Sequence, residues 1–85
     1  MNIPTIDDIR LIIGEVIGNV EVVKSLDEDS PLLGAVPEFD SVAVFNLLLT
    51  FEEKYDVIVE DDEVDIEIFE SVGAFHKFAK NKIHN

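Results

Sequence analysis

The most constraining feature of the chain is a long apolar run that begins directly after a proline-bearing loop. The loop Pro37-Glu38-Phe39 leads into the pair Asp40-Ser41, and residues 42–55 follow with the spacing of a helix. Asp or Ser at such a boundary can accept hydrogen bonds from the unpaired N–H groups of the first turn. The same N–H groups and the helix dipole favour a phosphate at that end. Ser41 therefore has two interpretations: an ordinary helix cap, or a hydroxyl placed to carry a phosphate-linked group.

The helix predicted over residues 41–54 has two apolar faces. At roughly 100° per residue, one face gathers Val44, Leu47, Leu48, Phe51 and Tyr55. A second face, nearly opposite, gathers Val42, Phe45 and Leu49. Such a helix is either buried all round or shows one face to a partner. Full enclosure is hard to achieve in 85 residues, so we expect the first face in the core and the second as an exposed stripe.

Two further helices are predicted on either side of this run. Residues 6–17 have the apolar spacing of a helix, with Thr5 and Asp8 forming a capping box. Residues 72–83 form the last helix, capped by Ser71. A shorter helical segment over residues 65–69 would direct Ile66 and Phe69 inward.

Two segments are expected to be loops. Residues 19–40 form a long connection, with a short helical turn possible around residues 29–33. The apolar anchors that could pin this connection are Leu26, Leu32, Leu33, Val36 and Phe39. Residues 57–59 are expected to be extended, with Val57 or Ile58 directed inward. The four carboxylates at 60–63 lack the spacing and glycine of a calcium loop, so we expect a solvated acidic loop and no metal site.

The composition limits the possible partners and setting. Nineteen acidic against six basic residues give a net charge of −13, which disfavours nucleic acid as a partner. The charge either steers the protein toward basic protein surfaces or only keeps it soluble and monomeric. Cysteine is absent, and the sequence shows no signal peptide and no apolar stretch of membrane-spanning length. We expect one cytoplasmic domain over residues 1–85.

The residue inventory argues against an enzyme. The two histidines, His76 and His84, lie in the last helix and tail, far in sequence from Ser41. A nucleophilic serine needs a histidine within hydrogen-bond reach, held by a third group. We therefore expect no catalytic residues.

The central stretch resembles the acyl carrier protein family. Gly34-Ala35, then Asp40-Ser41-Val42, then Phe51-Glu52-Glu53-Lys54-Tyr55 are similar to the family pattern Leu-Gly-x-Asp-Ser-Leu and Leu-Glu-Glu-x-Phe. The similarity runs from about residue 32 to residue 72. It implies an all-α fold: a small four-helix bundle of three longer helices and one short helix, with a long first loop.

The resemblance also implies a function. In the family, a phosphopantetheinyl transferase uses coenzyme A to attach 4′-phosphopantetheine to the serine, here Ser41, which Asp40 precedes. Acyl or aminoacyl cargo is carried on the thiol of this arm as a thioester. Loading and transferring enzymes with basic docking surfaces would bind along the helix. By position, their contacts would be Val42, Phe45, Leu49, Glu52 and Glu53.

The chain departs from the family pattern in places. Carriers of fatty acid synthesis usually have acidic residues where Ala43 and Asn46 stand, and Leu or Met where Val42 stands. These differences indicate a specialised carrier that serves one dedicated synthetase or transferase in a secondary or envelope pathway. The alternative is a non-carrier acidic helical interaction module, in which Asp40-Ser41 acts only as a helix cap.

Overall fold

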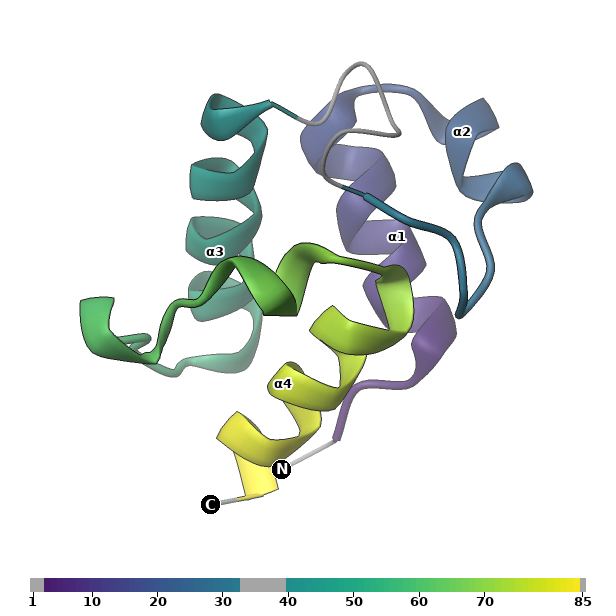
Figure 1. Ribbon diagram of the computed structural model, residues 1–85. Coiled ribbons are helices and arrows are strands. Elements are labelled where there is room, and N and C mark those ends of the chain that lie inside the picture. Colours follow the sequence, from purple (N-terminus) through teal and green to yellow (C-terminus); the bar gives the residue numbers. More distant parts are fainter. Residues whose placement is uncertain (1–2, 33–39, 85) are drawn as a thin grey trace.

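The computed structural model describes residues 3–32 and 40–84, which fold around a central helix. The described residues form four α-helices, namely α1 (Ile6–Ile17), α2 (Val20–Ser25), α3 (Ser41–Tyr55) and α4 (Val72–His84). Two 3₁₀ turns, η1 (Asp61–Glu63) and η2 (Ile66–Phe69), lie between α3 and α4. Helix α1 contacts α2, α3 and α4, so it forms the centre of the bundle (Figure 1). The all-α prediction is confirmed, with three longer helices as expected.

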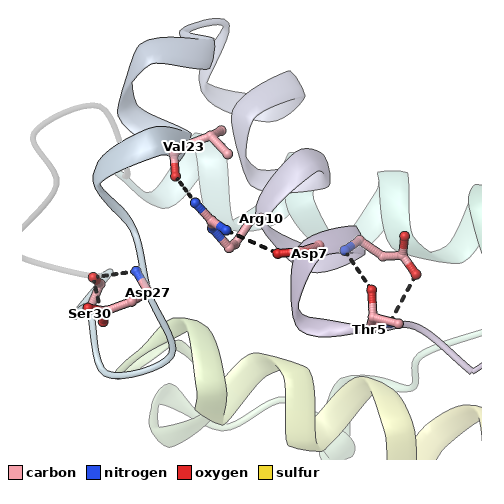
Figure 2. A network of polar contacts seen from close by, with 7 residues as sticks. Thr5, Asp7, Arg10, Val23, Asp27 and Ser30 are labelled. Carbon is pink, nitrogen blue, oxygen red and sulfur yellow. Dashed lines mark hydrogen bonds and ion pairs between the residues drawn. The ribbon is translucent and has the colours of Figure 1, made fainter.

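The start of α1 shows how local sequence sets a helix boundary. Thr5 Oγ1 accepts the N–H of Asp8 at 3.1 Å, and the Asp8 carboxylate accepts the N–H of Thr5 at 2.9 Å. This is the predicted capping box, visible at the start of α1 in Figure 2. The helix ends at Gly18, whose φ of 78° lies in the left-handed region that glycine tolerates. The predicted bounds of this helix are confirmed.

Helix α2 lies inside the segment that we expected to be a loop. Asn19 caps it by accepting the N–H of Glu21 at 3.0 Å. The guanidinium of Arg10, on α1, donates to the carbonyl of Val23 at 2.8 Å and pairs with Asp7 at 3.0 Å (Figure 2). Because α2 has only six residues, these contacts with α1 and the cap stabilise a helix that would be marginal alone.

The rest of the connection is fastened to the start of α4. The N–H of Val72 donates to Ser30 O at 3.0 Å, and the N–H of Gly73 donates to Glu28 O at 2.8 Å. Leu26 and Leu32 are buried, as expected for anchors. The expected anchors Leu33, Val36 and Phe39 lie outside the described residues, as does the end of the possible turn at 29–33. Residues 29–32 of that turn are not helical.

The core lies where α1, α3 and α4 meet. Phe51 of α3 packs edge-on against Phe75 of α4, with ring centroids 5.7 Å apart. The buried apolar side chains are Ile9, Ile12, Ile13, Leu26, Leu32, Ala43, Leu47, Phe51, Phe69, Val72, Phe75, Ala79 and Ile83. Ser71 caps α4 as predicted, accepting the N–H of Ala74 at 3.0 Å.

One prediction about the core is wrong. The segment expected at residues 65–69 is the 3₁₀ turn η2, and Phe69 is buried, but the side chain of Ile66 is 68% exposed. Val64 and Ile68 pack against the core instead, on either side of Ile66.

In the part of the chain that the structure describes, no helix is long and apolar enough to cross a membrane.

Candidate functional site

Capping of α3 falls to Asp40, not to Ser41. Asp40 has extended backbone angles, and its carboxylate accepts the N–H of Ala43 at 3.0 Å. Ser41 is the first residue of the helix and is exposed. No hydrogen bond joins its hydroxyl to another residue that the structure describes. Of the two interpretations of Ser41, that of an ordinary cap does not fit this geometry.

The first turn of α3 also offers backbone donors beside this hydroxyl. The N–H of Val44 makes the first intrahelical bond, to Asp40 O at 3.0 Å. Helix geometry therefore leaves the N–H groups of Ser41 and Val42 free to face an anion. No side chain within the first turn itself is acidic, and the carboxylate of Asp40 at the cap is engaged with the N–H of Ala43.

The two predicted faces of α3 are confirmed. Leu47 and Phe51 are fully buried, whereas the side chains of Val42, Phe45 and Leu49 are 66%, 62% and 42% exposed. We call these three residues the exposed stripe. It begins one residue after Ser41 and continues along the helix, so a protein that approaches the serine meets this apolar surface.

The two glutamates at the end of α3 have different surroundings. Glu52 is half-buried, and its carboxylate accepts the N–H of Val59 at 2.7 Å. Glu53 is exposed to solvent. Glu53 is therefore free to meet a partner's basic side chain, whereas Glu52 is already engaged with the segment that follows the helix.

A groove that the sequence did not reveal lies beside the exposed stripe. It has a volume of about 380 Å³, with α3 on one side and the chain after it on the other. Its lining residues are Phe45, Leu48, Leu49, Glu52, Val59, Asp61 and Val64. Val57 and Val59 pack inward and Ile58 is 71% exposed. The prediction that Val57 or Ile58 is directed inward is confirmed by Val57. The alternation of side chains along an extended segment was the signal that Val59 would also point inward.

A second cavity of about 540 Å³ lies between α1, α2 and the end of α3. It is lined by Asp8, Leu11, Ile12, Glu15, Val23, Lys24, Lys54 and Tyr55. Burial raises the pKa of Tyr55, and the neighbouring charge of Asp8 raises it further. The cavity is at the opposite end of α3 from Ser41.

The described histidine side chain, that of His76, is bonded to the chain before α1 and not to Ser41. His76 Nε2 lies 2.9 Å from the carbonyl oxygen of Pro4, which can only accept, so this nitrogen carries the proton. His76 is thus half-buried and fastens Pro4, which precedes α1, to α4. The side chain of His84 lies outside the described part. Within residues 3–32 and 40–84, no group of three metal-ligating side chains is found.

Comparison with known proteins gives one informative match. No protein-family model and no curated protein matches the chain. Among solved structures, the chain is similar to the solution NMR structure of a holo acyl carrier protein from Nitrosomonas europaea. The two sequences are 36% identical, and the match covers 94% of this chain and 96% of the other, with a TM-score of 0.86.

Proposed function

This chain belongs to the acyl carrier protein family, and we propose that it carries acyl or aminoacyl groups as thioesters on a 4′-phosphopantetheine arm attached to Ser41. The proposal rests on the separate roles of two neighbouring residues at the start of α3. Asp40 caps the helix, and the adjacent Ser41 hydroxyl is exposed. The chain's role is then to present cargo, while catalysis belongs to its partners.

The residues at the start of α3 fit the group that would be attached. In the attachment step the Ser41 oxygen attacks the phosphorus that bears the pantetheine arm in coenzyme A. A phosphoanhydride bond breaks, adenosine bisphosphate leaves, and the serine proton passes to a base of the transferase. The free N–H groups of the first turn and the positive end of the helix dipole favour the resulting phosphodiester.

Partner enzymes would dock along α3. The exposed stripe provides apolar contact area next to Ser41, and the net charge of −13 attracts basic docking surfaces. Among the two glutamates expected to contact partners, Glu53 fits this role best because Glu52 is bonded to Val59. The phosphopantetheinyl transferase is the first such partner.

The surface of α3 supports a carrier with a narrow set of partners. Ala43 is buried, so an acidic side chain could not stand at this position without a desolvation cost. Asn46 is exposed but neutral. The partner surface near Ser41 is thus uncharged at the two positions where carriers of fatty acid synthesis are acidic, which favours one dedicated synthetase or transferase as the user of the cargo.

Intact-mass spectrometry tests the proposal directly. The purified chain is incubated with coenzyme A, magnesium and a broad-specificity phosphopantetheinyl transferase, alongside its Ser41→Ala variant and a known carrier. We expect a gain of one phosphopantetheine on the parent chain and none on the variant. If neither this transferase nor one from the same genome modifies the parent chain while the known carrier is loaded, the interaction-module alternative takes precedence.

A further inference from the structure

The chain that follows α3 forms one wall of the groove beside the exposed stripe. We call residues 57–64 the wall segment; Val59, Asp61 and Val64 of this segment line the groove. Apart from the short turn η1 (Asp61–Glu63), it has no regular secondary structure. Its position therefore depends on the packing of Val57, Val59 and Val64 against the core and on the individual bonds that hold it.

The near end of the wall segment is fastened to α3. The Glu52 carboxylate accepts the N–H of Val59 at 2.7 Å, and the carbonyl of Glu52 accepts the N–H of Val57 at 3.2 Å. Glu52 thus fixes the backbone both at Val57, just after α3 ends, and at Val59, which lines the groove.

The far end is fastened to α4 by an ion pair. Lys82 Nζ donates to the two carboxylate oxygens of Glu63 at 2.9 and 2.7 Å. The same carboxylate accepts the N–H of Glu60 at 2.8 Å. Glu63 therefore connects the backbone of the wall segment to the last helix, and Lys82 is the residue on α4 that holds it.

Because of the charges around this ion pair, the position of the far end of the wall segment depends on Lys82. Residues 60–63 are four consecutive carboxylates that repel one another. The side chains of Lys82 and Glu63 are 22% and 33% exposed, and this pair is the shortest and most shielded of the ion pairs found among the described residues. Shielded pairs are screened by salt less than exposed ones. The hydrogen bond from Lys82, with that from Glu60, holds the pKa of Glu63 below its ordinary value.

We propose that Lys82 and Glu63 form a latch that ties the far end of the wall segment to α4, keeps the segment in place as the second wall of the groove, and so positions a group tethered at Ser41 within the groove. Phe45, which lines the groove, stands one helical turn after Ser41, so the tether begins next to the groove. The role toward cargo rests on the proposed function, whereas the latch itself is a property of the unmodified protein. Both residues act by positioning.

Hydrogen exchange on the unmodified protein tests the latch. The variant Lys82→Met removes the charge and keeps the aliphatic chain, Lys82→Arg keeps the charge, and Lys80→Met is the matched control because Lys80 is exposed on α4. We expect Lys82→Met to speed exchange at the amides of Val59 and Glu60 by about threefold to tenfold. Lys82→Arg and Lys80→Met should leave these rates unchanged. An unchanged rate in Lys82→Met, or a uniform increase over all helices, would overturn the latch.

Thioester cleavage then tests the effect on cargo. The transferase is supplied with octanoyl-coenzyme A, so that Ser41 receives the arm with an octanoyl group, and cleavage by hydroxylamine is followed by intact mass. We expect Lys82→Met to be cleaved about threefold faster than the parent chain, with Lys82→Arg and Lys80→Met matching the parent. Equal cleavage rates in all four proteins would refute the positioning role. Failure of every protein to load would refute the proposed function, while the exchange rates still decide the latch.

Discussion

The carboxylate of Asp40 accepts the N–H of Ala43 at 3.0 Å, so the residue before Ser41 stabilises the start of α3. Ser41 itself adds no bond to another described residue through its hydroxyl. Helix capping therefore falls to Asp40, and the proposed attachment of the arm falls to Ser41. Mutations of the two residues can test these roles separately.

Replacing the two residues in turn tests this division. We expect Asp40→Ala to lower the free energy of unfolding by about 1 kcal/mol, because a capping bond is lost. Ser41→Ala should change it by less than about 0.5 kcal/mol, as at other surface positions. Urea denaturation followed by circular dichroism measures both. Equal losses in the two variants would show that the hydroxyl also stabilises the helix.

Replacing Phe45 by Glu tests the exposed stripe. Because the Phe45 side chain is 62% exposed, Phe45→Glu should leave the melting temperature nearly unchanged while raising the KM of the transferase reaction. Phe51→Ala, at a fully buried position, is the contrasting variant and should cost about 3–5 kcal/mol of stability. Unfolding of Phe45→Glu at room temperature would place Phe45 in the core and contradict the stripe.

Gly73 permits the close approach between α4 and the connection that precedes α3. A Cβ on this residue would lie 2.8 Å from Glu28 O and 2.7 Å from Glu28 Cγ. Alanine is the better helix former, yet we expect Gly73→Ala to destabilise the protein by about 1–3 kcal/mol, because the backbone of Glu28 must move. Asn81→Ala, on the exposed surface of α4, should be neutral or stabilising. Thermal unfolding compares the two, and stabilisation by Gly73→Ala would refute the tight contact.

Tyr55 provides a spectroscopic test, since it is the chain's only tyrosine. Burial, and then the charge of Asp8, raise its pKa in the folded protein, so its absorbance should titrate above the ordinary value of about 10. A raised pKa means that the folded state binds this proton more tightly than the unfolded state. The resulting stability is present below about pH 10 and is lost as the pH rises through the folded pKa. Asp8→Asn should lower the pKa of Tyr55 partway, and identical titrations in buffer and in denaturant would contradict the shift.

The sequence predicted α1, α3 and α4 to within a residue because each has a clear apolar period and a cap. It did not predict α2, whose sequence Val-Glu-Val-Val-Lys-Ser is rich in β-branched residues that favour extended chain. Asn19 was the available signal, since Asn followed by Glu21 can cap a helix. The contacts of Arg10 with α2 join separate segments and could not be foreseen from local pattern.

The candidate site was predicted in position but not in detail. Asp and Ser cap helices about equally well, so the sequence could not decide which of Asp40 and Ser41 does so. The bond between Glu52 and Val59 depends on how the chain turns after α3, and it changes which glutamate is free for a partner. The groove could not be predicted from the helix pattern either, because its second wall comes from residues that follow α3.

The bonds from Ser30 and Glu28 to the start of α4 have a consequence for the order in which the protein folds. They join residues 28 and 30 to a helix that is synthesised after α1, α2 and α3. Contacts between distant segments form late, because the intervening chain must be ordered first. The connection that leads to Ser41 therefore gains its anchorage only after α4 has left the ribosome, and a nascent chain that lacks α4 should be a poor substrate for modification.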